Sequence, residues 1–104
     1  MVHYGSKGVA LKLSLEWDEE KAKENYRKHQ VSFEEGSTVL NDPFSITIDD
    51  PDHSADERRF LDIGSSERGR ILVVSYTERD GGIRIISCRK ATRLERRRYE
   101  EGIN

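Results

Sequence analysis

The stretch ILVVSYTERDGGIRIISCRKATRLERRR, residues 71–98, decides the fold. Residues 71–78 and 83–88 are rich in β-branched and aromatic side chains, which favour strands. Between them, residues 79–82 (RDGG) supply glycine for the positive φ angles that a tight hairpin turn needs. The stretch therefore predicts a β-hairpin whose two strands provide much of the core.

A short basic helix is expected after this hairpin. Thr92 and Glu95 have the spacing of a capping box, in which each side chain accepts a hydrogen bond from the other residue's backbone N–H. From position 84 to position 98, Glu95 is the only acidic residue among seven cations. These cations are Arg84, Arg89, Lys90, Arg93, Arg96, Arg97 and Arg98. Such a segment is typical of a surface that holds a phosphate backbone, although charge runs also occur as plain solvated faces.

The position of the hairpin turn decides which side chains share a face of the sheet. A turn on residues 81–82 pairs Tyr76 with Ser87 and leaves Arg89 roughly 7 Å further along the same face. We favour this register because it gathers polar groups.

Two other registers are open. A turn on residues 80–81 pairs Tyr76 with Ile85 and puts the same arginine roughly 13 Å away along the strand. A three-residue loop flips the face and brings Tyr76 beside Arg84 and Lys90.

The earlier part of the chain predicts one strand and two helices. Apolar and polar residues alternate over positions 11–17, which is typical of a half-buried strand. Asp18 is suited to cap a helix that extends to about position 28. Ser32 begins a second capping box and a short helix, which ends before Pro43.

Two further strands are predicted at residues 44–49 and 57–63, with an acidic loop between them. The resulting order is β-α-α-β-β-β-β-α, an α+β fold in which short connections join the last four strands into an antiparallel meander. The two early helices cover one face, and the C-terminal helix or a partner chain should cover the other. We expect residues 1–10 to be a flexible tail and residues 11–104 to be a single domain.

The composition limits the class of protein. The chain has 104 residues, 34% of them hydrophobic and 37% charged, and its formal net charge is −2. That total hides an acidic first half, −7 over residues 1–57, and a basic second half, +5 over residues 58–104. No segment has the apolar length of a membrane span or the pattern of a signal peptide, and Cys88 has no partner for an internal disulfide. These features indicate a cytoplasmic protein.

Four stretches together resemble a known family: LEWDEEKAKENYRKHQVSFEE, NDPFSITIDDPDHSADERRF, GRILVVSYTERDGGIRIISCRKAT and ERRRYEE. Their order and spacing over about residues 15–101 are similar to those of BrnT-type toxins of bacterial toxin–antitoxin pairs, which adopt a RelE-like ribonuclease fold. Three positions depart from the usual pattern. Gln30 stands where glycine is usual, and Gly36 and Cys88 stand where alanine is usual.

The resemblance implies an RNA-cleaving toxin that inhibits translation. Its expected partners are RNA and a small antitoxin with a ribbon-helix-helix DNA-binding domain, and the complex commonly represses its own operon. A homodimer within the toxin–antitoxin complex is also possible under this resemblance. No metal or cofactor is expected.

Metal-free RNA cleavage needs a base for the ribose 2′-OH, cations for the phosphorane charge and an acid for the leaving 5′ oxygen. The arginines expected to converge on the phosphate come from adjacent strands and are Arg59, Arg84 and Arg89. Glu57 or His53 is the candidate base, and Tyr76 or His53 the candidate acid. Lys90, Arg93 and Arg97 are expected to bind the RNA backbone.

Each of these residues also has a purely structural interpretation. Glu57 and Arg59 can form a cross-strand ion pair, Tyr76 can be a core residue, and Arg84 can be a partner contact or a solvated strand residue. Likewise, the whole chain can be a non-catalytic nucleic-acid-binding or protein-interaction module. A catalyst requires a base beside the arginines, whereas a binding module requires only the cations.

Overall fold

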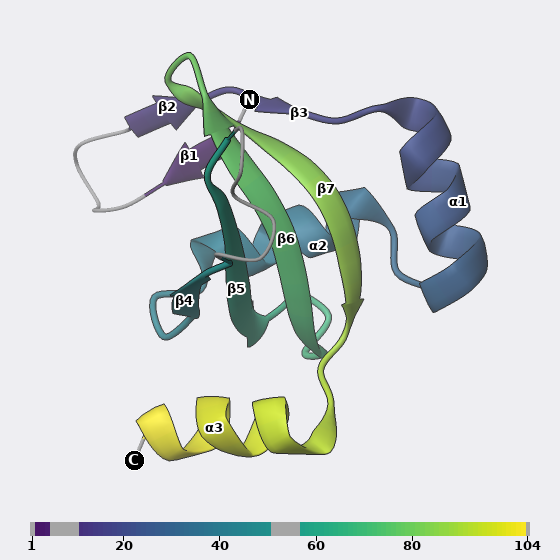
Figure 1. Ribbon diagram of the computed structural model, residues 1–104. Helices are drawn as coiled ribbons and strands as arrows, with labels where there is room; N and C mark the ends of the chain where they lie inside the picture. The colour runs from purple at the N-terminus through teal and green to yellow at the C-terminus, as the bar shows by residue number, and fades with distance from the viewer. Residues whose placement is uncertain (1, 5–10, 51–56, 104) are drawn as a thin grey trace.

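A five-stranded mixed sheet organises the computed structural model, which describes residues 2–4, 11–50 and 57–103. The strand order is β3-β7-β6-β5-β4 (Figure 1). Four strands form an antiparallel meander: β4 (Ile46–Asp49), β5 (Arg59–Ser65), β6 (Ile71–Arg79) and β7 (Gly82–Lys90). The short strand β3 (Leu15–Glu16) pairs with β7 in parallel, which makes the sheet mixed rather than wholly antiparallel.

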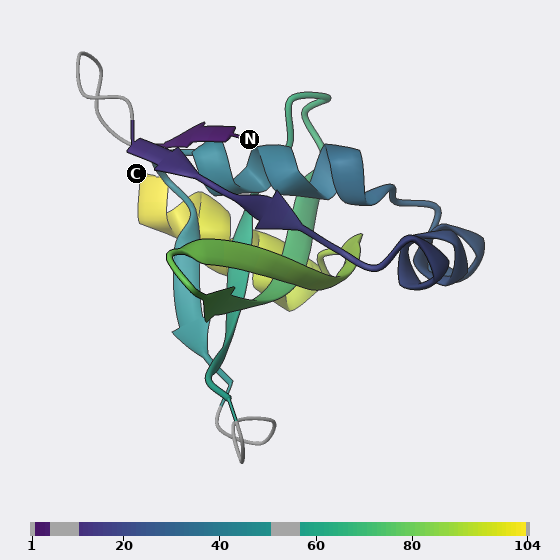
Figure 2. The ribbon, with the colours of Figure 1, turned by 90° about the horizontal axis from the view of Figure 1, so that it is seen from above.

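Three α-helices and one 3-10 turn complete the fold: α1 (Glu19–His29), α2 (Phe33–Thr38), η1 (Val39–Asn41) and α3 (Arg93–Ile103). Helix α2 lies behind the sheet in Figure 1 and α1 stands beside β7, an arrangement that the view from above in Figure 2 repeats. Helix α3 crosses the end of the sheet at which β5 and β7 finish. The predicted α+β class is therefore confirmed. No helix in the described part of the chain is long and apolar enough to cross a membrane.

The N-terminal part differs from the expectation. A small separate sheet pairs β1 (Val2–Tyr4) with β2 (Leu11–Leu13), so part of the segment expected to be a tail is a strand. The single strand expected over residues 11–17 is divided at Ser14, whose carbonyl accepts a hydrogen bond from the backbone N–H of Ile83. A side chain at Gly82 would overlap this carbonyl, so the close approach requires glycine there.

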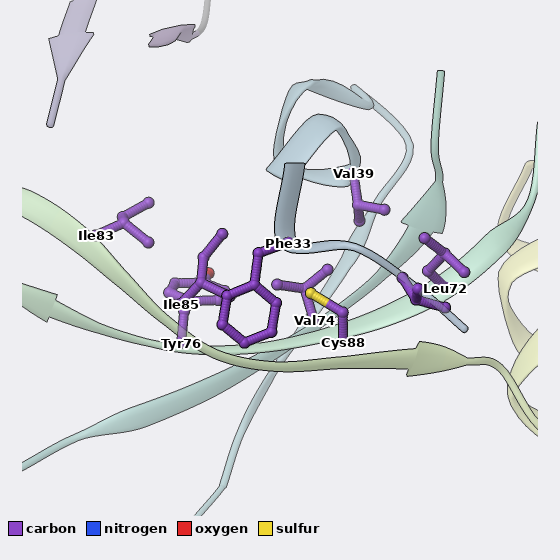
Figure 3. Packing of buried hydrophobic residues seen from close by; sticks show 9 residues of the cluster. Phe33, Val39, Leu72, Val74, Tyr76, Ile83, Ile85 and Cys88 are labelled. Atoms are coloured by element: carbon purple, nitrogen blue, oxygen red, sulfur yellow. The ribbon is translucent and has the colours of Figure 1, made fainter. Parts of the chain in front are cut away.

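The main core lies between α2 and the sheet. Its buried residues include Phe33 of α2, and Figure 3 shows the Phe33 ring lying over the strands beside Val74 and Cys88. The other members labelled there are Val39, Leu72, Tyr76, Ile83 and Ile85. Alternate residues of β6 supply this cluster, whereas its members on β7 include Ile85 and Cys88, which are three residues apart.

A smaller core lies on the opposite face of the sheet, under α3. Tyr99 of α3 is buried against Ile63 of β5 and Val73 of β6. Its hydroxyl donates a hydrogen bond to Asp42 Oδ2 at 2.6 Å, which holds α3 against the loop before β4. The C-terminal helix therefore covers part of the second face. The sequence predicts that either this helix or a partner chain does so.

The favoured hairpin register is wrong. Asp80 and Gly81 have φ angles of 49° and 77°, which places the turn one residue earlier than residues 81–82. Tyr76 consequently pairs with Ile85, the register of the second alternative. The ladder then skips Ile86, because Ser75 pairs with Ser87, and this β-bulge brings the residues after it onto the other face.

Side chains cap the three α-helices as predicted. Asp18 accepts backbone hydrogen bonds from the first turn of α1, and Ser32 accepts one from Glu35 at 3.0 Å. The box at α3 is complete: Glu95 donates its backbone N–H to Thr92 Oγ1, and Thr92 donates its own to Glu95 Oε1 at 2.8 Å. At α2 the box is half made, because the Glu35 carboxylate binds Arg70 and Ser66 instead.

Helix α1 is attached to the sheet through Asn25, a buried residue that the sequence does not single out. Its amide accepts from the backbone N–H of Cys88 at 3.1 Å and donates to the carbonyl of Cys88 at 2.8 Å. It also donates to the carbonyl of Val31 at 2.9 Å. The side chain thus occupies a place on the free edge of β7 where another strand would otherwise pair.

Candidate functional site

The face of the sheet opposite α2 carries a row of three polar residues. Arg59 of β5 pairs with Thr77 of β6, and Thr77 pairs with Arg84 of β7. Paired residues in adjacent strands point to the same face, and strands lie about 4.8 Å apart, so the two arginine backbones are roughly 10 Å apart. We call Arg59, Thr77 and Arg84 the cationic row. Helix α2 lies behind the sheet in Figure 1, so the face opposite α2 is the one turned toward the viewer.

The middle residue of the cationic row has an unused polar group. Thr77 is fully buried, and its Oγ1 has no hydrogen-bond partner within the described residues. Buried hydroxyls are usually hydrogen-bonded, because an unpaired one costs about 1–3 kcal/mol. Such exceptions occur at functional sites, where a ligand completes the bonding.

An acidic side chain lies next to the cationic row. Glu57 precedes Arg59 by two residues, and its carboxylate is 3.7 Å from Nη2 of Arg79, which follows Thr77 by two residues. Both side chains are exposed, so the pair is weak in energy. The contact places a carboxylate beside Arg79, two residues along β6 from the middle of the cationic row.

Arg84 leaves most of its guanidinium available. Its nearest carboxylate, Glu16 of β3, lies 3.8 Å from Nη1, beyond the length of a hydrogen bond. The side chain is about 30% exposed. Arg84 is therefore anchored at one side by charge and still open to an anion.

Arg89 lies further along β7 and is engaged elsewhere. The bulge puts it on the same face as Arg84, but opposite Val73, which is four residues or roughly 13 Å along β6 from Thr77. Its guanidinium makes two hydrogen bonds to Glu95, at 2.7 and 2.9 Å. The Arg89 pair lowers the pKa of Glu95 to about 2, and the Glu95 carboxylate raises the pKa of Arg89. Arg89 therefore ties α3 to the sheet and does not converge with the cationic row.

Tyr76 also does not join the arginines, and the expectation that it lies beside them is wrong. It faces the main core, where its hydroxyl donates to Asp62 Oδ1 at 2.9 Å. Burial and the Asp62 carboxylate raise the pKa of Tyr76 strongly. Asp62 also accepts from Thr47, and its own pKa is raised by burial. The bulge explains the error, because the favoured register would have placed Tyr76 on the face of Ser87 and Arg89.

The remaining candidates lie outside the cationic row. His53 is outside the described residues. Lys90 is exposed at the end of β7, in register with Leu72 on the α2 face, and Arg93 and Arg97 are exposed on α3. Sequence reasoning missed Thr77 and Arg79, although strand alternation from Glu57 and Arg59 identifies both once the register is known.

These features define a small α+β protein with two arginines and a carboxylate on one face of its sheet. A family profile described as the ribonuclease toxin BrnT of type II toxin–antitoxin systems matches residues 17–95. The match spans most of the chain, so this chain belongs to the BrnT family of ribonuclease toxins. Its fold is similar to the crystal structure of the Brucella abortus ribonuclease toxin BrnT, with a TM-score of 0.62 and 24% identity over 79% of this chain and 100% of that chain. No curated protein gives a match.

Proposed function

We propose that this chain is a metal-independent endoribonuclease that cleaves RNA through attack of a ribose 2′-OH on the adjacent phosphate. In this reaction the O2′–P bond forms, the P–O5′ bond breaks and the leaving 5′ oxygen takes up a proton. The observation that carries the proposal is the cationic row with the Glu57–Arg79 pair beside it on one face. Family membership supports the ribonuclease activity.

In the proposed reaction Arg59 and Arg84 bind the scissile phosphate from its two sides. Their planar guanidinium groups suit phosphate oxygens. The Thr77 hydroxyl between them is a further donor to a phosphate oxygen once the arginine side chains rearrange around the ligand. Preorganised donors of this kind each contribute about 10²–10³-fold to the rate.

Glu57 is the proposed general base, and Arg79 orients its carboxylate. A positioned base contributes about 10²–10⁴-fold. His53 is the proposed acid for the 5′ oxygen, since Tyr76 is buried on the opposite face with its hydroxyl bound to Asp62. Lys90, Arg93 and Arg97 are proposed to bind the RNA on either side of the cut.

We further propose that a cognate antitoxin neutralises the enzyme by covering the cationic row. The type II family supports the existence of such a partner. A ribbon-helix-helix domain in the antitoxin, a homodimer within the complex and a RelE-like relationship of the fold stay predictions.

The test compares three variants in single-turnover cleavage of RNA at saturating protein. Arg84→Ala and Glu57→Gln should each lower the rate by at least about 10²-fold. Arg58→Ala is the matched control, because Arg58 is adjacent to Arg59 but binds Asp49 and stacks on Phe60. It should cleave like the wild type.

Two results would count against the proposal. Normal cleavage by Glu57→Gln removes Glu57 as the base. A wild-type chain that binds RNA but never cleaves it, with or without ribosomes, establishes the non-catalytic binding module instead.

A further inference from the structure

A hollow of about 480 Å³ lies at the end of the sheet, between the start of β6, the end of β7 and α3. This is the end at which α3 crosses beneath the sheet in Figure 1. Its lining contains three cations and one carboxylate, namely Arg70, Lys90, Arg96 and Glu100. Gly69 and Ile71 complete it. The volume is within the range of small-molecule sites.

One of the three cations is already committed. Arg70 donates from Nε to Glu35 Oε2 at 2.9 Å and from Nη2 to the carbonyl of Gln30 at 3.2 Å. It adds positive charge to the hollow but has few donors left for a ligand. Lys90 and Arg96 are therefore the cations that a ligand would contact.

Lys90, Arg96 and Glu100 are exposed and make no ion pair within the described part of the chain. Arg96 and Glu100 are one helical turn apart on α3, a spacing at which opposite charges commonly pair. They do not pair with each other. Lys90 and Arg96 therefore present donors to the hollow and Glu100 presents an acceptor, and none of the three is paired with another.

We propose that this hollow binds one nucleotide of single-stranded RNA, with its phosphate on Lys90 and Arg96 and its base donating a hydrogen bond to Glu100. The inference rests on the proposed ribonuclease function and adds a second substrate site to it. A carboxylate accepts well from the exocyclic amine of cytosine, so the site prefers cytosine to uracil, whose only donor is its ring N–H.

The mixed lining favours a nucleotide over an acidic segment of a protein partner. A peptide carboxylate would satisfy the two cations but would leave Glu100 without a donor. A nucleotide offers an anion and an N–H donor within one molecule, which matches all three side chains.

The position of the hollow fits a strand that also reaches the cationic row. Lys90 follows Arg84 by six residues on β7, which is roughly 20 Å, and the two are on opposite faces, so a strand that contacts both passes around the end of the sheet. A helical strand carries one phosphate per about 3.4 Å, so about six nucleotides connect the two sites. A ten-nucleotide RNA therefore spans both.

The test uses ten-nucleotide 2′-O-methyl oligomers of cytidine and of uridine, which cannot undergo 2′-OH attack. Binding is measured by fluorescence anisotropy between 50 and 200 mM salt. We expect the wild type to bind the cytidine oligomer about 3–10-fold more tightly, the effect of one hydrogen bond. Glu100→Ala should bring that ratio to about 1.

The cationic side chains have a separate readout. Lys90→Ala and Arg96→Ala should each weaken the binding of both oligomers. Each should also lower the slope of log affinity against log salt by about 0.7, the value for one phosphate on a single strand. Lys28→Ala is the matched control, because Lys28 is exposed on α1 and makes no ion pair within the described residues. It should change neither quantity.

Each contrary result has a defined meaning. If Lys90→Ala and Arg96→Ala behave like Lys28→Ala, or if Glu100→Ala keeps the preference for cytidine, the proposed site is wrong. Loss of antitoxin binding without any change in RNA binding makes the hollow a protein interface. The effect of Arg84→Ala on cleavage is measured separately and does not depend on these binding results. A negative result for the hollow is therefore distinguishable from a negative result for the ribonuclease function.

Discussion

Gly36 of α2 lies directly against Cys88 of β7, and the two residues fit only as a pair. A methyl group built on Gly36 would overlap the Cys88 Sγ atom and lie 3.1 Å from its Cβ. Both residues are buried, and burial raises the pKa of the Cys88 thiol to about 12, so the sulfur acts as a small apolar group. The absence of a side chain at Gly36 therefore provides the space that the Cys88 sulfur occupies.

This relationship predicts strong coupling between the two positions. Gly36→Ala alone should destabilise the fold by about 1–3 kcal/mol through overpacking, and Cys88→Ala alone by about 1 kcal/mol through a small cavity. The double variant should be at least as stable as the wild type, because alanine is also the better helix former. Urea unfolding of all four proteins gives the coupling energy. Additive effects of the two changes would refute the pairing.

The end of α1 predicts a stabilising substitution. Gln30 adopts the left-handed conformation, with a φ angle of 59°, and its backbone N–H closes the helix on the carbonyl of Tyr26. Glycine adopts this conformation without the steric cost of a side chain. Gln30→Gly should therefore raise the free energy of unfolding by about 0.5–1 kcal/mol, reduced by loss of two long side-chain hydrogen bonds of 3.3 Å. His29→Gly, one residue earlier and inside the helix, is the matched control and should destabilise.

The Arg89–Glu95 pair predicts a dependence of stability on pH. The pKa of Glu95 falls from its ordinary value of 4.5 to about 2 in the folded protein. The contribution of Glu95 to the free energy of unfolding is therefore fully present above about pH 4.5 and is lost as the pH falls toward 2. Its upper bound is about 3 kcal/mol. Glu95→Gln should be less stable than the wild type at pH 6, and the difference should shrink between pH 5 and pH 3.

The matched control for this prediction is Glu101→Gln, an exposed carboxylate near the end of the same helix. It removes one carboxylate from the same helix but no ion pair within the described residues, so it measures the effect of the Glu→Gln change itself. A constant difference for Glu95→Gln across the range would contradict the role assigned to the pair.

Kinetics should separate Arg84 from Arg89. Arg84→Ala is expected to lower single-turnover cleavage by about 10²–10³-fold at saturating protein, because it removes a donor to the phosphate. Arg89→Ala should lower the rate of single-turnover cleavage by less than about tenfold. Glu95→Gln should have the same effect, because each change removes the ion pair between α3 and the sheet. A loss of 10²-fold or more in Arg89→Ala with normal cleavage by Glu95→Gln would instead place Arg89 at the phosphate.

Binding residues should show a different pattern. Arg97→Ala is expected to weaken RNA affinity in a salt-dependent manner and to leave single-turnover cleavage nearly unchanged at saturation. The measurement pairs RNA titrations at two salt concentrations with the cleavage assay. A cleavage defect that persists at saturation would move Arg97 into the reaction itself.

The sequence alone predicts the hairpin, the helices and their caps because these depend on local chemistry. Strand propensity, turn glycines and capping residues act within a few positions of each other. The parallel pairing of β3 with β7 was not predicted, because two residues of strand carry almost no pattern and their partner is far along the chain.

The site was harder to predict, because one bulge decides which face a side chain occupies. Ile85 and Cys88 are both buried although they are three residues apart, which strict alternation forbids. That spacing is the signal for the bulge at Ile86, and it also places Arg84 and Arg89 on one face. The ion pair between Arg89 and Glu95 was not predicted from residue types. The capping box assigns the Glu95 carboxylate to the backbone N–H of Thr92 and does not indicate that Arg89 binds the same carboxylate.

The pairing of β3 with β7 and the attachment of Asn25 to Cys88 have a consequence for synthesis on the ribosome. The first helices have no sheet to pack on until residues 82–90, near the end of the chain, have been made. Such distant pairings form late in folding. We therefore expect a nascent chain to be without activity until translation is almost complete. A chain that terminates before residue 82 has neither the main core nor Arg84, so truncated translation products should be harmless to RNA.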